Sequence, residues 1–373
     1  MPGNKLLAPS TYHRIVSGNA RGVAPTLIRC ALRLAETPYA LAVRIRNSQY
    51  DSGKRRIHRL AVPVISVGNI TLGGTGKTPL VAWIAQWYFQ RGIPTAIVSR
   101  GYLASRGAVN DEALLLRARL PDVPHLQNPD RVAAATQAVE RLGCQVVVLD
   151  DAFQHRRIAR DLDIVTLDAL QPFGYEHVFP RGTLREPVEG LRRAGLIVLS
   201  RADAVAPDQR QAIRLRVAQL APKADWVEVA HRPECLVAAD GRRAELATVD
   251  HRPVAAFCGI GNPAAFRHTL QQCGVRLMAL REFPDHYAYP PASLEALDRW
   301  AAALDAEAVL CTEKDLVKIG RDRLGGKPLW AVRIGLDFLA GQQYLRDRLQ
   351  SLLAVKDVRR RADRNANALP KYH

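Results

Sequence analysis

The sequence predicts an α/β fold: a mostly parallel sheet with helices on both faces, followed by a second, smaller α/β unit. Short buried strands alternate with amphipathic helices from residue 63 onward, as in "PVISV", "TAIVS" and "CQVVVLDD". A glycine-rich loop separates the first of these strands from a helix, and a second alternation begins near residue 250. Apolar strands that alternate with helices are typical of parallel sheets with both faces covered.

The order of these segments divides the chain into five expected regions. After "WVEVAHRPE" the composition becomes more polar, as in a β linker, and the chain closes with a basic tail expected to be disordered. The regions are an N-terminal helix with a basic flank (1–60), the main α/β domain (61–225), the linker (226–250), the C-terminal α/β domain (251–356) and the tail (357–373).

The chain carries a large positive charge. Its 373 residues contain 53 Lys and Arg against 36 Asp and Glu, which gives a formal net charge of +17. Such an excess favours anionic partners: nucleic acid, lipid headgroups or phosphorylated substrates. We find neither a secretory signal nor an apolar run of about 18 residues, so we expect a cytoplasmic location. The 6 cysteines lack a C-x-x-C pair and are expected to be reduced thiols rather than zinc ligands.

The N-terminal region combines an apolar helix with a basic flank. Residues 26–36 predict a helix that Pro38 interrupts, and seven basic residues, six Lys or Arg and one His, follow over residues 41–59. Such a segment can lie in a membrane interface with its arginines on anionic headgroups. It can equally be a helix that packs on a core beside a solvated basic flank.

The glycine-rich loop has the features of a phosphate-binding P-loop. A strand leads into residues 71–78 and a helix leads out, and the loop ends in Gly-Lys-Thr, although Thr71 stands where the strict pattern has glycine. We therefore expect a P-loop NTPase-like domain, with Lys77 on the β and γ phosphates and Thr78 on Mg²⁺. The residues expected to bind the nucleotide are Thr71, Leu72, Gly73, Gly74, Thr75, Gly76, Lys77 and Thr78.

Two acids follow a later buried strand. Asp150 and Asp151 close "VVVLDD" at the carboxyl end of that strand, where ligands bind in open sheets. Either residue can be the second metal-holding carboxylate of a P-loop enzyme. His155, four residues on, can be a site residue or a packed surface residue.

Two other pairs each have a functional and a structural interpretation. Asp111 and Glu112 begin a helix that Asn110 can cap, and acids are favoured in first helical turns for electrostatic reasons alone. Arg185 and Glu186 lie in a loop rich in Pro and Gly; they can read a phosphorylated or sugar-like ligand, or form an exposed ion pair.

The C-terminal unit contains two further polar stretches. Asp285 and His286, in "EFPDHYAYPP", can form an acid–base pair, although a lone histidine in a loop is more often without a special role. In "CTEKDLVKI", residues 311–319, a strand ends in alternating charges, and the sequence suggests no mechanism for it.

Two classes of P-loop protein are considered on the residues alone. A nucleic-acid-associated P-loop ATPase would explain the positive charge, but it predicts basic stripes interleaved with aromatics, and none is found. A P-loop GTPase switch module requires a guanine-specificity motif, for which "SRADAV" at 200–205 is a poor match.

The ordered set of motifs is more specific than any one of them. The chain resembles the tetraacyldisaccharide 4′-kinase family from about residue 15 to 350. The motifs that carry the resemblance are "SVGNITLGGTGKTP", "VSRGY", "NDEALLLR", "PDRVAAA", "LDDAFQHR", "RGTLREP", "DHYAY" and "TEKDLVK". It departs from the family at Ala152, where most members have Gly, at Asn110, and in a shortened 103–110 segment.

The resemblance implies an activity and a site. Family members transfer the γ-phosphate of ATP to the 4′-hydroxyl of a tetraacyldisaccharide 1-phosphate at the cytoplasmic face of the inner membrane. Asp111 is then the catalytic base, assisted by His286, with Lys77 on the phosphates. Thr78, Asp150 and Asp151 hold Mg²⁺. The implied substrate-binding residues are Arg100, Tyr102, Arg131, Arg185 and Glu186.

The resemblance also implies the partners. These are ATP with Mg²⁺, the lipid A precursor and the anionic surface of the inner membrane, with no nucleic acid, and a monomer is expected. Because the substrate is a lipid, the enzyme must reach the membrane, which favours the interfacial interpretation of residues 20–59.

Overall fold

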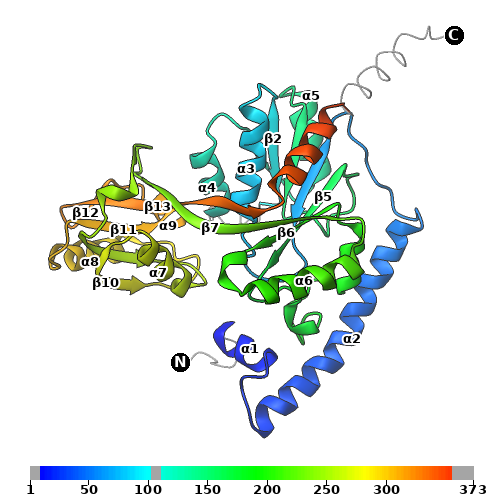
Figure 1. Ribbon diagram of the computed structural model, residues 1–373, viewed down its shortest axis with the longest axis horizontal. Coiled ribbons are helices and arrows are strands. Elements are labelled where there is room, and N and C mark those ends of the chain that lie inside the picture. Colours follow the sequence, from blue (N-terminus) through cyan, green and yellow to red (C-terminus); the bar gives the residue numbers. More distant parts are fainter. Residues whose placement is uncertain (1–8, 102–110, 355–373) are drawn as a thin grey trace.

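The computed structural model describes residues 9–101 and 111–354 (Figure 1). Three parts of the sequence-based predictions lie outside these ranges: Tyr102 as a substrate-binding residue, the 103–110 segment with Asn110 as a helix cap, and the basic tail 357–373.

The P-loop domain is built on a parallel sheet, as predicted. The strands lie in the order β7-β6-β5-β1-β4-β2-β3, and each pair in this series is parallel. They are β1 (Val64–Gly68), β2 (Thr95–Ser99), β3 (His125–Gln127), β4 (Val146–Asp150), β5 (Leu162–Asp168), β6 (Leu196–Ser200) and β7 (Asp225–Val237). Strands β1, β2, β4 and β6 are buried along their whole length, which explains their unbroken apolar sequences.

Helices cover both faces of this sheet, as predicted. Side chains of α3 (Lys77–Phe89) and α4 (Asp111–Arg119) pack on one face, against Ile65, Val148 and Ile164. On the other face α5 (Arg131–Glu140) packs against Val147, and α6 (Pro207–Leu220) packs against Ile197. The mostly parallel α/β fold expected from the sequence is therefore confirmed.

The C-terminal domain continues the same sheet rather than forming a separate one. β7 pairs antiparallel with β13 (Lys327–Ala340), from Ala331↔Val237 to Ala340↔Glu228, and the order then runs on through β11, β9 and β10. The remaining strands are β8 (Arg243–Ala244), β9 (Pro253–Cys258), β10 (Arg276–Glu282), β11 (Ala308–Thr312) and β12 (Arg323–Leu324). The helices of this domain are α7 (Pro263–Gln272), α8 (Pro291–Ala302) and α9 (Glu313–Ile319).

The chain returns to the P-loop domain at its end. Residues 342–354 are helical, and the helix lies beside α3 (Figure 1). Leu345, Leu349 and Leu352 belong to the same buried cluster as the α3 side chains, and the Tyr88 hydroxyl donates to the Leu349 carbonyl at 2.9 Å. Leucines spaced four and three residues apart give this helix one apolar face, which the core of the P-loop domain covers.

The N-terminal helix is longer than predicted. After α1 (Pro9–Val16), α2 runs without a break from Val23 to Asp51, with Pro38 inside it, so the prediction that Pro38 interrupts the helix is wrong. A proline inside a helix costs about 3 kcal/mol, and tertiary contacts hold the turns on either side of it. The Glu36 carboxylate accepts from the Val178 amide at 2.7 Å, and the Tyr39 hydroxyl donates to the Arg185 carbonyl at 3.3 Å.

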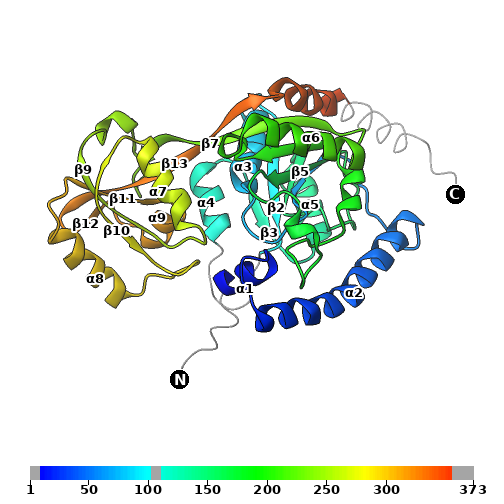
Figure 2. The ribbon, with the colours of Figure 1, turned by 60° about the horizontal axis from the view of Figure 1, so that its bottom comes forward.

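Helix α2 lies along the side of the P-loop domain that faces away from the C-terminal domain, and it curves as it does so (Figure 2). One face of it is apolar and open to solvent. The exposed residues of that face are Val23 (78% exposed), Leu27 (64%), Leu34 (79%), Leu41 (55%) and Ile45 (50%). Spacings of four and seven residues align them along the helix. None of the helices in the described part of the chain is long and apolar enough to cross a bilayer.

Candidate active site

The predicted phosphate loop lies between β1 and α3, as the sequence requires. Gly73 and Gly76 have positive φ of 102° and 76°, a backbone conformation that residues other than glycine seldom adopt. A Cβ at Gly76 would also overlap the imidazole of His231 from β7. Helix α3 starts at Lys77, so its first amides and its positive dipole end are available to an anion.

Neighbouring strands hold the loop in shape. The Thr75 hydroxyl lies 2.8 Å from that of Thr166 on β5, and the Thr75 carbonyl accepts from the Ser200 hydroxyl at 2.8 Å. Arg201 donates to the Gly74 carbonyl at 2.9 Å. These three contacts come from the same domain as the loop.

His231 is a buried histidine beside the loop that the sequence did not single out. Burial lowers its pKa to about 4, and the positive charges of Arg201 and Arg119 act in the same direction. The imidazole is therefore neutral at pH 7. Its contact with Gly76 fixes the distance between β7 and the start of α3.

Lys77 lies beside Asp151, the second of the two acids predicted to hold the metal. Its Nζ lies 3.4 Å from Asp151 Oδ1, and Arg185 Nη1 donates to both oxygens of Asp151 at 2.8 and 2.9 Å. Burial alone would raise the pKa of Asp151, but Lys77 and Arg185 outweigh it and lower that pKa. Asp151 is therefore an ionised carboxylate between two cations.

Asp150 has a contrasting environment at the end of β4. Its side chain is 4% exposed, and burial raises its pKa to about 7, with Glu112 and Asp151 adding to the effect and Lys77 opposing it. A buried carboxyl with this pKa would be drawn to its ionised form by a nearby divalent cation.

The donor set fits a magnesium ion that arrives with phosphate. Within residues 9–101 and 111–354, no group of three His, Cys, Asp or Glu side chains could hold a metal by itself. Mg²⁺ is usually bound by one or two carboxylates together with substrate phosphates. The hydroxyl of Thr78 and the carboxylates of Asp150 and Asp151 supply ligands of that kind.

The predicted base pair is assembled from both domains. Asp111, at the first residue of α4, is 8% exposed, and its Oδ2 lies 3.0 Å from Nδ1 of His286. His286 belongs to the C-terminal domain and has φ of 58°. Lys318 of α9 also reaches this oxygen, with Nζ 2.8 Å from Oδ2. No role was predicted for Lys318, which is the last residue of the motif "TEKDLVK".

Two of the predicted substrate-binding arginines lie near the two acids. Arg131 Nη2 donates to the Asp151 carbonyl at 3.2 Å, and its Nε is buried without a hydrogen-bond partner among the described residues. Burial lowers the pKa of Arg131; Asp151 opposes this, and the charge of Arg100 adds to it. Arg131 and Arg185 thus place two guanidinium groups beside Asp151, and the charge of Arg100 acts on Arg131.

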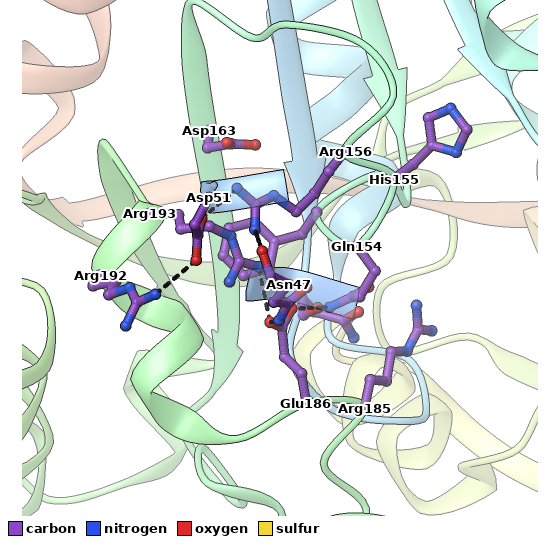
Figure 3. Close-up of polar contacts among 12 residues, drawn as sticks. Asn47, Asp51, Gln154, His155, Arg156, Asp163, Arg185, Glu186, Arg192 and Arg193 are labelled. Carbon is purple, nitrogen blue, oxygen red and sulfur yellow. Dashed lines mark hydrogen bonds and ion pairs between the residues drawn. The ribbon is translucent and has the colours of Figure 1, made fainter. Parts of the chain in front are cut away.

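Glu186, the remaining predicted substrate-binding residue, is fully buried (0% exposed). Its carboxylate accepts from Asn47 at 3.1 Å, from Gln154 at 2.9 Å and from Arg193 at 2.9 Å (Figure 3). With all these partners, it ties α2 and the 154–156 turn to the loop that carries Arg185. This burial favours a supporting role over direct contact with a sugar. His155, whose role the sequence left open, points away from this cluster.

A second set of contacts fixes the C-terminal end of α2 to the same region. Arg156 donates to the Asn47 carbonyl at 3.0 Å and to Asp51 at 2.6 Å, and Arg192 donates to Asp51 at 3.0 Å (Figure 3). The helix that bears the exposed apolar face is therefore attached to the domain that bears the phosphate loop.

The parallel sheet, the phosphate loop, the paired acids and the carboxylate–histidine pair together define a P-loop phosphotransferase. Comparison with known proteins gives the family. A model of the tetraacyldisaccharide-1-P 4′-kinase family matches residues 28–354, and the chain belongs to this family.

Individual relatives agree with this assignment over most of the chain. A tetraacyldisaccharide 4′-kinase of Anaeromyxobacter sp. (strain K) is 40% identical over 364 residues, which cover 92% of this chain and 96% of the relative. One from Chlorobaculum parvum is 37% identical and covers 88% of this chain and 96% of its own length. LpxK from Aquifex aeolicus, crystallised with ATP, superposes with a TM-score of 0.70 at 27% identity and covers 87% of this chain and 99% of its own. The resemblance stated from the motifs is confirmed, and the kinase is favoured over the ATPase and GTPase alternatives.

Proposed function

We propose that this chain transfers the γ-phosphate of ATP to the 4′-hydroxyl of a tetraacyldisaccharide 1-phosphate, the lipid A precursor. The observation that carries the proposal is the pairing of Asp111 with His286 at 3.0 Å, across 175 positions of sequence, in a P-loop protein of this kinase family. A switch GTPase needs no carboxylate–histidine pair, whereas phosphorylation of an alcohol needs a base for its proton.

The residues divide the reaction between them. The loop 71–78 and the amides at the start of α3 bind the phosphates of ATP, and Lys77 neutralises their charge. When bound, Mg²⁺ supplies further charge neutralisation, held by Thr78 together with Asp150, Asp151 or both. Asp111 accepts the hydroxyl proton as the new O–P bond forms and the bond to ADP breaks. His286 orients Asp111.

The cations around the acids supply the substrate-binding part of the proposal. Arg131 and Arg185 present guanidinium groups beside Asp151, with the charge of Arg100 acting on Arg131, and guanidinium groups suit phosphate and sugar oxygens. Tyr102, outside the described residues, stays in this set on the resemblance alone. Glu186 supports the set by holding the Arg185 loop.

We further propose that the protein acts as a monomer at the cytoplasmic face of the inner membrane, with α2 in the interface. The exposed apolar face of α2 is flanked by exposed arginines, including Arg33 and Arg44, which suits anionic headgroups. Apolar side chains arrayed along one helix in this way gain free energy on leaving water for lipid.

The direct test is transfer of labelled γ-phosphate from ATP to a tetraacyldisaccharide 1-phosphate in detergent. Wild type should label the lipid, and Asp111→Ala should lose about 10³-fold or more of kcat while still binding ATP. No transfer by wild type, or wild-type rates from Asp111→Ala, would contradict the proposal. Sedimentation of the detergent-bound enzyme tests whether it is a monomer.

The membrane part has its own test. The double variant Leu27→Glu/Leu34→Glu should lose binding to vesicles of anionic phospholipid in a flotation assay, because two charges would enter the apolar zone. Leu215→Glu on α6 is the matched control, since Leu215 is also an exposed leucine on a helix (57% exposed). Equal binding by the double variant and the control would remove α2 from the interface.

A further inference from the structure

Helix α9 (Glu313–Ile319) concentrates buried charge in seven residues. Glu313 is 7% exposed, Asp315 is 0% exposed, and the Lys318 side chain is 8% exposed. Buried charges are costly unless they are paired. A helix of two turns that buries three of them needs a specific partner for each.

The partners of the first two lie on different elements. Glu313 accepts from Arg119 of α4 and, at 2.9 Å, from Arg333 of β13. Asp315 accepts from the Tyr289 hydroxyl at 2.9 Å and from the Gly259 amide at 3.2 Å. Arg119 closes the helix that Asp111 opens, and Tyr289 lies three residues after His286.

Lys318 completes the connection. Its ammonium lies 2.8 Å from Asp111 Oδ2 and donates to the Tyr287 carbonyl at 3.1 Å. Tyr287 directly follows His286. Lys318 therefore contacts the carboxylate of the base and the backbone of the loop that carries the histidine.

Both side chains that contact the Asp111 carboxylate contact the same oxygen. Lys318 and His286 each contact Oδ2, and in the described part of the chain no donor reaches Oδ1. Two donors on one oxygen fix the rotation of the carboxylate and leave the other oxygen to receive a proton.

From this geometry we propose that Lys318 is a positioning residue of the phosphoryl transfer. It holds Asp111 by Oδ2 and holds the His286 loop by the Tyr287 carbonyl, so that base and histidine keep one relative placement. The proposal rests on Asp111 being the base, as proposed above. Small misplacements of a reacting group can cost about 10²-fold in rate.

The test compares Lys318→Met with Lys327→Met. Lys327 is also a lysine of the C-terminal domain that donates to a backbone carbonyl, that of Ala301 at 2.8 Å, but it contacts no residue of the candidate site. Lys318→Met should lower kcat about 100-fold with KM for ATP and for lipid within about twofold of wild type. Lys327→Met should keep wild-type kcat. Equal kcat in the two variants would overturn the proposal.

A double-mutant cycle separates positioning from a general structural role. In an Asp111→Asn background, Lys318→Met should cause little further loss of kcat, because Lys318 acts through Asp111. A full additional 100-fold loss would overturn the proposal. If Lys318→Met does not fold, Lys318→Gln takes its place with the same expectations. Wild-type activity in Asp111→Asn alone would instead refute the base itself, so the two failures are distinguishable.

Discussion

The phosphate loop and the Asp111 cluster are built in opposite ways. The loop is held by Thr166, Ser200 and Arg201, all from strands of its own domain or directly after them. The Asp111 cluster takes one member from α4 and two from the C-terminal domain, His286 and Lys318. Nucleotide binding should therefore survive damage to the contact between domains, whereas proton removal should not.

The largest effect is expected at the loop. Lys77→Ala should lower kcat by about 10³- to 10⁴-fold and weaken ATP binding, because it removes the charge that offsets the phosphates. Lys223→Ala, at an exposed lysine of the same domain, should leave both unchanged. Steady-state kinetics measure kcat, and calorimetric titration measures the affinity for ATP. Normal ATP binding in Lys77→Ala would show that this loop does not hold the nucleotide.

A stability effect is expected beside the loop, at Asp150. Its pKa rises from 3.8 to about 7 on burial, so the folded chain binds this proton more tightly than the unfolded chain. The contribution to stability is then greatest below pH 4 and is lost as the pH rises toward 7. By pH 8 the loss amounts to about 4 kcal/mol. Asp150→Asn removes this cost of ionising a buried carboxyl, so the variant should unfold at a higher denaturant concentration than wild type at pH 8.

The same variant should lose function. With Asn at 150, MgATP should raise the melting temperature less than it raises that of wild type, because one of the two proposed carboxylate ligands is gone. At pH 4 the two proteins should have nearly the same free energy of unfolding. A variant no more stable than wild type at pH 8 would mean that Asp150 is ionised at no cost.

A smaller effect on activity is expected in the Asp111 cluster, whose residues come from both domains. His286→Ala should lower kcat about 10²-fold and leave ATP affinity unchanged, because the loop takes its hydrogen bonds from Thr166, Ser200 and Arg201. His251→Ala is the matched control: His251 also has positive φ (57°) and lies 3.7 Å from an aspartate, but it is 90% exposed. A parallel fall of kcat and ATP affinity in His286→Ala would refute the independence of the two parts.

The sequence predicted local features well. The buried strands, the loop and its helix follow from apolar runs and glycine spacing, which are properties of short segments. The pairing of Asp111 with His286 came from the resemblance, because nothing local links residues 175 positions apart.

Features set by distant contacts were missed. The helix that passes through Pro38 is supported by Val178 and Arg185, which no local pattern reveals. Likewise, α9 looked like a strand end with alternating charges, because its buried charges have their partners on other elements. The burial of Glu186 depends on Asn47, Gln154 and Arg193 meeting in space.

The return of residues 342–354 to the P-loop domain has a consequence for synthesis. The C-terminal domain is in effect an insertion, since the chain leaves the first domain at β7 and comes back at the end of β13. On the ribosome the first domain cannot complete its core until residues 342–354 emerge. A nascent chain released before residue 342 would expose the apolar side of α3, so completion of the core of the first domain is coupled to synthesis of residues 342–354.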